Sequence, residues 1–135
     1  MDRLFFDANV LFSAAYRSDA GLLALWKLKD TVRCSSRYAL EEARINLDKE
    51  SQLAALSKLS EGLTLFEAPE ASLPQGIILP EKDVPILLAA IGLQATHLLT
   101  GDIRHFGPYF GKTIAGVKVM LPGAYLQDRA GRNRS

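Results

Sequence analysis

The segment LFFDANVLFSAAY, residues 4–16, most constrains how this chain can fold. It opens with three consecutive apolar residues, which is typical of a parallel strand that is covered on both faces. Asp7 follows directly at the end of this strand, and Asn9 is placed to cap the helix that comes next. A carboxylate at the end of a buried strand is costly unless it is hydrogen-bonded, paired or bound to a cation. We therefore expect Asp7 to hold a metal ion, and capping of the helix by Asp7 is the structural alternative.

Size and composition describe an ordinary globular domain, with 48% hydrophobic and 23% charged residues among 135. The net charge of +1 neither requires nor excludes a polyanionic partner. A single cysteine excludes a disulfide framework and fits a reducing, cytoplasmic setting. No apolar run approaches the roughly 20 residues of a membrane span, so we expect no membrane association. We expect one domain over residues 1–127 and a basic, flexible tail over 128–135 that carries Arg129, Arg132 and Arg134.

Strands and helices are predicted to alternate along most of the chain. Apolar or β-branched runs predict strands at 4–6, 31–35, 63–66, 97–100 and 117–121. Helical spacing predicts helices after residue 9, over 21–29, from 37, over 51–60 and 84–94, and from 122. This order is typical of an α/β fold with a parallel sheet and helices on both faces. Ligands of such sheets bind beyond the carboxyl ends of the strands.

Several acidic residues are placed to reach that edge. Asp7 and Asp102 follow strands, and Asp83 precedes a helix. Each has a structural alternative, because Asp83 is also a candidate helix cap and Asp102 a candidate Asx-turn residue. Carboxylates gathered at one edge raise one another's pKa unless a cation neutralises them. Oxygen ligands suit Mg²⁺ or Mn²⁺, so we expect one of these ions as the cofactor.

The two histidines do not suggest a zinc site, because the chain has only one cysteine. His97 begins a predicted strand, and we expect it to be structural. His105 lies close after Asp102 and is placed to contact a phosphate group. The first strand is followed by no glycine-rich turn, which argues against a dinucleotide-binding fold.

Four motifs in order resemble the PIN-domain family. They are DANV at 7–10, an acid in the helix after the second strand, KDVPILLAAI at 82–91 and LLTGDIRHF at 98–106. The resemblance covers nearly the whole chain. It implies a three-layer α/β/α fold with a five-stranded parallel sheet ordered 3-2-1-4-5. It also implies a metal-dependent ribonuclease, often the toxin of a VapC-type toxin–antitoxin pair.

Matched position by position, the resemblance implies a set of site residues. Glu41 and Glu42 both fit the second acid. Helical phase leaves the choice open, and we choose Glu42 because the family commonly has a small residue next, here Ala43. The family often has a further acid near its last motif, where this chain has Arg104 and His105. This departure leaves open whether a second metal position is occupied. The implied catalytic and metal-binding residues are Asp7, Glu42, Asp83 and Asp102, supported by Asn9, Thr100, Arg104 and His105.

The sequence therefore predicts a Mg²⁺- or Mn²⁺-dependent endoribonuclease that hydrolyses RNA phosphodiester bonds by a two-metal type of mechanism. The expected partners are RNA, a cognate antitoxin protein and a second copy of the chain in a homodimer. Two other readings stay open. One is a non-catalytic PIN-like module that binds RNA or protein, and the other is a metal-dependent DNA nuclease or phosphatase that uses the same carboxylates.

Overall fold

The first strand lies in the middle of the sheet. The structure is a computed structural model that describes the backbone of residues 1–134 and the side chains up to residue 132. The predicted α/β class is confirmed, with a sheet that is mostly parallel. The strand order is β3 (Thr64–Leu65), β2 (Thr31–Ser35), β1 (Asp2–Phe6), β4 (His97–Leu99), β6 (Val117–Met120) and β5 (Thr113–Ile114).

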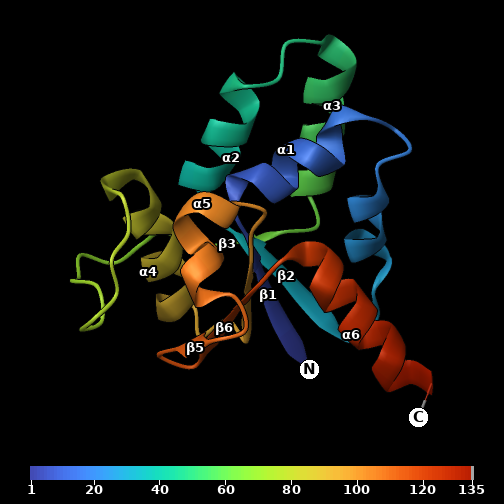
Figure 1. Cartoon of the computed structure of the whole chain (residues 1–135). Coiled ribbons are helices and arrows are strands. Elements are labelled where there is room, and N and C mark those ends of the chain that lie inside the picture. The colour runs from blue at the N-terminus through green and yellow to red at the C-terminus, as the bar shows by residue number, and fades with distance from the viewer. Residues whose placement is uncertain (135) are drawn as a thin grey trace.

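Helices cover both faces of this sheet. Successive strand residues point to opposite faces, and Leu4, Phe5 and Phe6 are all fully buried, so neither face of β1 reaches solvent. The helices α1, α2 and α3 lie beside one another in Figure 1. Within residues 1–134, no helix combines the length and apolar character needed to cross a membrane. The α-helices are α1 (Ala8–Tyr16), α2 (Arg37–Ile45), α3 (Glu50–Ser60), α4 (Val84–Gly92), α5 (Ile103–Phe106) and α6 (Pro122–Arg134), and the 3₁₀ helices are η1 (Gly21–Lys27), η2 (Glu81–Asp83) and η3 (Gly107–Tyr109).

The sheet has one strand more than the predicted five. The predicted order 3-2-1-4-5 holds for the parallel strands, with β6 as the fifth. The extra strand β5 pairs antiparallel with β6, and Ala115 and Gly116 join the two strands with φ angles of 49° and 88°. Positive φ at both central residues is characteristic of a tight hairpin turn. Because β5 has only two residues, no periodic pattern in the sequence marks it.

The strand order creates a crevice at one edge of the sheet. From β1 the chain moves outward through β2 to β3, and from β4 it moves outward in the other direction to β6. Connections that leave in opposite directions separate above the carboxyl ends of β1 and β4, which is where parallel sheets bind ligands. Asp7 follows β1 and Thr100 follows β4 at this point.

The last helix replaces most of the expected flexible tail. The structure differs from that expectation because α6 continues to Arg134 instead of ending near residue 127. Its Tyr125 hydroxyl donates to Asp2 Oδ2 at 2.6 Å, and Arg132 donates to the same oxygen at 3.2 Å. Arg129 donates to the Lys29 carbonyl at 2.8 Å. These contacts join the end of the chain to its first strand; the side chain of Arg134 and all of Ser135 lie outside the described residues.

Replacement of Tyr125 by Phe tests this attachment. Tyr125 is fully buried, and the variant loses only the hydroxyl, which donates to the Asp2 carboxylate and accepts a longer hydrogen bond of 3.3 Å from Arg129. A hydrogen bond to a charged group contributes about 1.5 to 3 kcal/mol, so we expect urea denaturation to show a loss of that size in the free energy of unfolding. Tyr16→Phe is the matched control, because Tyr16 is half exposed on α1. Equal stabilities of the two variants would contradict the role given to the Asp2 contact.

Candidate functional site

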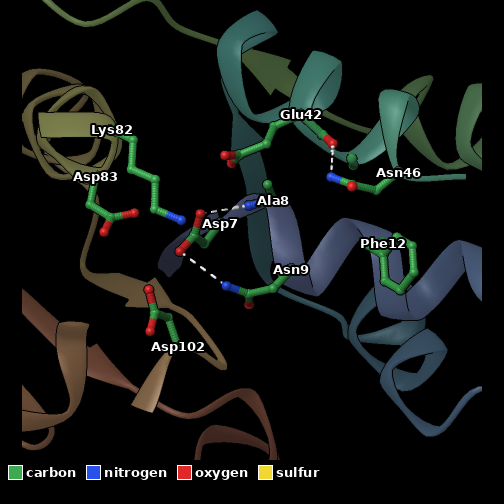
Figure 2. A pocket seen from close by; sticks show the side chains of 10 residues that line it. Asp7, Ala8, Asn9, Phe12, Glu42, Asn46, Lys82, Asp83 and Asp102 are labelled. Atoms are coloured by element: carbon green, nitrogen blue, oxygen red, sulfur yellow. Dashed lines mark hydrogen bonds between the residues drawn. The ribbon is translucent and has the colours of Figure 1, made fainter. Parts of the chain in front are cut away.

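Four carboxylates from distant parts of the sequence line one cavity of about 370 Å³. Figure 2 shows them around a common space. Asp7 stands at the end of β1, Glu42 on α2, Asp83 at the end of η2 and Asp102 beyond β4. The structure thus brings together the four acids that the sequence motifs single out, and it does so at the crevice between β1 and β4.

Asp7 is almost completely buried, with 3% of its surface exposed. Its Oδ1 accepts a hydrogen bond of 2.7 Å from the Ala8 N–H, which makes Asp7 the cap of α1. The expectation that Asn9 caps this helix is wrong, because the helix begins at Ala8, two residues earlier than expected, and Asn9 lies in its first turn. Asp7 therefore both caps α1 and lines the cavity, since a carboxylate oxygen can accept more than one bond.

The Thr100 hydroxyl connects the two strand ends that form the crevice. It donates to Asp7 Oδ2 at 2.8 Å and accepts from the Asp102 N–H at 3.1 Å. Asn9 lies beside it, donating to Asp7 Oδ2 at 3.2 Å and accepting from the Gly101 N–H at 2.7 Å. A side chain at Gly101 would begin only 3.3 Å from Asn9 Oδ1, so the chain passes close to Asn9 here. Asn9 and Thr100 thus fix the position of the Asp7 carboxylate relative to the backbone that carries Asp102.

The rotation of α2 separates the two candidate glutamates. Glu42 faces the cavity in Figure 2, and its backbone carbonyl accepts from the Asn46 side chain at 2.8 Å. Glu41 is exposed on another face of the helix, where Arg44 donates to it at 2.9 Å. Of the two positions that sequence reasoning left open, the structure therefore places Glu42 in the cavity.

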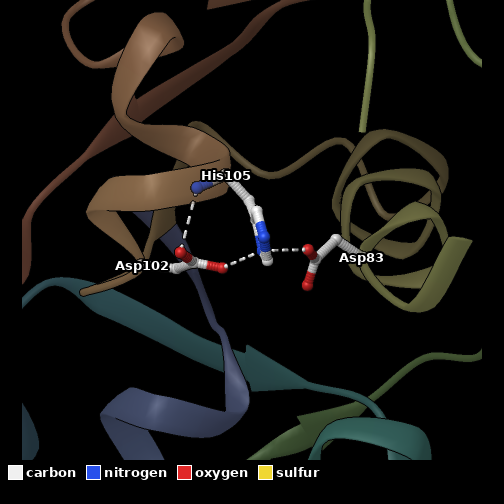
Figure 3. Close-up of side chains that lie close together, drawn as sticks. All are labelled: Asp83, Asp102 and His105. Carbon is white, nitrogen blue, oxygen red and sulfur yellow. Dashed lines mark hydrogen bonds and ion pairs between the residues drawn. The ribbon is translucent and has the colours of Figure 1, made fainter. Parts of the chain in front are cut away.

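Asp83 and Asp102 lie on either side of the His105 ring, as Figure 3 shows. The ring Nδ1 is 2.9 Å from Asp102 Oδ2 and 2.9 Å from Asp83 Oδ2. Its hydrogen bond goes to Asp102, and Asp83 Oδ2 is buried without a hydrogen-bond partner. Asp102 Oδ1 also accepts from the His105 N–H at 3.0 Å and so caps α5, whereas the expected cap by the Asp83 side chain on α4 does not form.

Burial dominates the electrostatics of the site. It raises the pKa of Asp7 to about 6, and although the hydrogen bonds from Thr100 and Ala8 lower that pKa, nearby Asp83 and Glu42 raise it further. Burial also raises the pKa of Asp83, and the nearby charge of Asp102 raises it further. Lys82 and His105 act in the opposite direction and lower this pKa. A cation between these carboxylates would relieve both the repulsion and the desolvation.

Sequence reasoning missed Lys82. Its side chain extends from η2 into the cavity toward the acids in Figure 2, so a positive charge lies among them. The backbone carbonyl of Lys82 accepts a 2.6 Å hydrogen bond from the Tyr38 hydroxyl, which fixes η2 against α2. In the sequence, only the position of Lys82 next to Asp83 pointed to a place at the site. The turn of η2 directs both side chains to the cavity. Arg104, which was expected at the site, is exposed on α5 and does not line the cavity.

The donors fit a hard or borderline divalent ion. Among the described side chains, Asp83, Asp102 and His105 form a compact group with one ligand atom of each within 4.8 Å of the others. Asp7 and Glu42 line the same cavity outside this compact group. The buried Asp83 oxygen that accepts no hydrogen bond is costly in the protein alone, and coordination to an ion would satisfy it.

Replacement of Asp7 by Asn should reduce the pH dependence of stability. A folded-state pKa of about 6, above the ordinary 3.8, means that the folded protein binds the additional proton between these pH values. The free energy of unfolding of EDTA-treated protein should therefore fall as the pH rises from about 4 to about 6, by about 3 kcal/mol from Asp7. Urea denaturation across this range measures the slope. Identical slopes for wild type and Asp7→Asn would contradict the buried, charged state assigned to Asp7.

Comparisons with known proteins identify the fold. No protein-family model and no curated protein matches the sequence. Among solved structures, VapBC2 from Rickettsia felis, bound to a DNA fragment from their promoter, aligns with a TM-score of 0.63 and 16% identity over 88% of this chain and 98% of that one. FitAB bound to an IR36 DNA fragment aligns with a TM-score of 0.55 and 17% identity, covering 88% of this chain and 94% of that one. Together with the ordered motifs, these likenesses show that the chain has a PIN-domain, VapC-like fold.

Proposed function

We propose that this protein is a metal-dependent nuclease that cleaves RNA phosphodiester bonds, with Asp7, Glu42, Asp83 and Asp102 as its metal-binding and catalytic residues. The convergence of these four carboxylates in one cavity at the sheet crevice carries the proposal. A structural role alone does not account for them, because clustered acids repel one another and burial of Asp7 and Asp83 raises the cost. The PIN-domain fold supports the same reading.

In this mechanism Asp7, Glu42, Asp83 and Asp102 would hold Mg²⁺ or Mn²⁺, and the ion would lower the pKa of a bound water and stabilise negative charge on the scissile phosphate. Thr100 and Asn9 orient the Asp7 carboxylate through its Oδ2. Such outer hydrogen bonds fix the direction of a ligand oxygen and keep it ionised. Both residues therefore act through Asp7.

Two cationic side chains are proposed to bind the RNA backbone. Lys82 extends into the cavity and can neutralise a phosphate that enters beside Asp83. Arg104 is exposed on α5, two residues after Asp102. Its position outside the cavity suits a contact with a neighbouring phosphate of the RNA strand and not with the scissile phosphate.

We further propose that this protein is the toxin of a toxin–antitoxin pair that acts in the cytoplasm. Two of the structures with which it shares its fold are VapBC2 and FitAB, both bound to DNA fragments. On this proposal, the chain binds a cognate antitoxin and forms a homodimer. Co-expression with the product of a small neighbouring reading frame, followed by light scattering of the purified complex, tests both partners.

Substitution of the acids tests the nuclease. Glu42→Gln and Asp83→Asn should each lower the rate of cleavage of single-stranded and structured RNA by at least about 100-fold, because the ion loses a charged ligand. EDTA should abolish cleavage by the wild type, and Mg²⁺ or Mn²⁺ should restore it. Glu41→Gln is the matched control, since Glu41 is next to Glu42 but faces solvent and pairs with Arg44. Its activity should equal that of the wild type.

Different outcomes distinguish the remaining readings. Cleavage that survives EDTA, or that persists in both acid variants, would reject the carboxylate site. Cleavage of single-stranded DNA in preference to RNA would indicate a DNA nuclease. Metal binding and RNA binding by calorimetry without any cleavage would indicate a binding module with this fold.

A further inference from the structure

The ring of His105 occupies the position between two acids of the cavity. Its Nδ1 lies 2.9 Å from one oxygen of Asp83 and 2.9 Å from one oxygen of Asp102. The ring nitrogen has hydrogen-bond geometry with Asp102 only. The Asp83 oxygen remains buried and without a hydrogen bond although 91% of that side chain is shielded from solvent. This arrangement leaves a strong acceptor aimed at the ring nitrogen with nothing donated to it.

The two separations from the ring nitrogen already suit ligands of one ion, and the third ligand pair, between the two carboxylates, lies within 4.8 Å. An octahedral ion with bonds of about 2.1 Å has neighbouring ligand atoms about 3 Å apart. The two separations of 2.9 Å from Nδ1 are close to this value. The backbone N–H of His105 donates to Asp102 Oδ1 at 3.0 Å, which directs Oδ2 of the same carboxylate toward the ring. The shape of the α5 turn therefore holds the imidazole and a carboxylate on the same side.

We propose that His105 Nδ1 is a metal ligand beside Asp83 and Asp102, and that this nitrogen makes the site bind Mn²⁺ in preference to Mg²⁺. The inference rests on the proposed metal-dependent function and narrows it to one ion. Mg²⁺ is a hard ion that strongly favours oxygen ligands, whereas first-row transition ions accept imidazole nitrogen readily. In binding, Nδ1 must be free of its proton: a protonated ring releases that proton to solvent and keeps the one on Nε2, and a neutral ring that carries its proton on Nδ1 changes to the Nε2 tautomer.

A rival arrangement uses the same contacts differently. The protonated ring of His105 would serve as an internal cation that balances Asp83 and Asp102 until a metal ion displaces it. The two arrangements make opposite predictions for removal of the ring. A lost ligand weakens metal binding, whereas a lost competitor strengthens it.

Calorimetric titration of EDTA-treated, dialysed protein with MnCl₂ and with MgCl₂ separates these cases. We expect the wild type to bind Mn²⁺ about tenfold more tightly than Mg²⁺ or better. His105→Ala should lower the Mn²⁺ affinity at least about tenfold while changing the Mg²⁺ affinity much less. His105→Asp supplies an oxygen instead and should remove the preference for Mn²⁺. His97→Gln is the matched control, because His97 packs edge-on against Tyr125 at the start of β4, and it should retain the preference.

A spectroscopic measurement on the wild type avoids dependence on how the variants fold. Electron spin-echo envelope modulation of bound Mn²⁺ should show coupling to an imidazole ¹⁴N in the wild type and in His97→Gln, and none in His105→Asp. Absence of that coupling in the wild type, equal affinities for the two ions, or tighter binding by His105→Ala would overturn the proposal. If these results occurred while RNA cleavage still required Asp83 and a metal, the proposed function would stand. If neither ion bound the wild type, both proposals would fall.

Discussion

The hydrogen bond from the Thr100 hydroxyl to Asp7 is the contact on which the cavity depends. It joins the ends of β1 and β4, the two central strands from which the chain turns in opposite directions. Parallel pairing brings those ends to the same level, and the crevice above them follows from the strand order alone. The hydroxyl then sets how the acids after the two strands face each other, since it also accepts from the Asp102 backbone. Glu42 and Asp83 approach this fixed pair from α2 and η2, and the Tyr38 hydrogen bond to Lys82 keeps those two elements together.

Charge at this crevice opposes the stability of the fold. Asp7 is hydrogen-bonded on both oxygens, yet burial still raises its pKa, so the protein holds the charged form at a cost. Lys82 and His105 provide partial compensation from within the site. The same desolvation that destabilises the metal-free protein strengthens any interaction with a cation or a phosphate, because charges attract more strongly in a medium of low polarity. Local instability and the capacity to bind ions thus have a single cause.

Much of this could be predicted from the sequence because it depends on local pattern and strand order. An apolar run followed by an acid identifies a strand end, and alternation of strands and helices places Asp7 and Asp102 at one edge. Helical phase could not decide between Glu41 and Glu42, since the answer depends on the rotation of α2 against α1, and the choice of Glu42 rested on the family resemblance alone. Lys82 was not recognised as a neighbour of the acids, and His105 was expected beside Asp102 but not against Asp83, because that contact joins separate segments. The ordering of α6 was missed for a similar reason: its cationic residues resemble a solvated tail until Asp2 is brought beside them.

The two edges of the sheet share a property that limits how copies of this protein can meet. Both are strands of only two residues, β3 on one side and β5 on the other. An edge of that length offers few free N–H and C=O groups, so another chain gains little by adding a strand to it. Extension of the sheet from one molecule into the next is therefore disfavoured at either side. Assembly of this protein is therefore favoured through surfaces where side chains rather than backbone hydrogen bonds determine which partner fits.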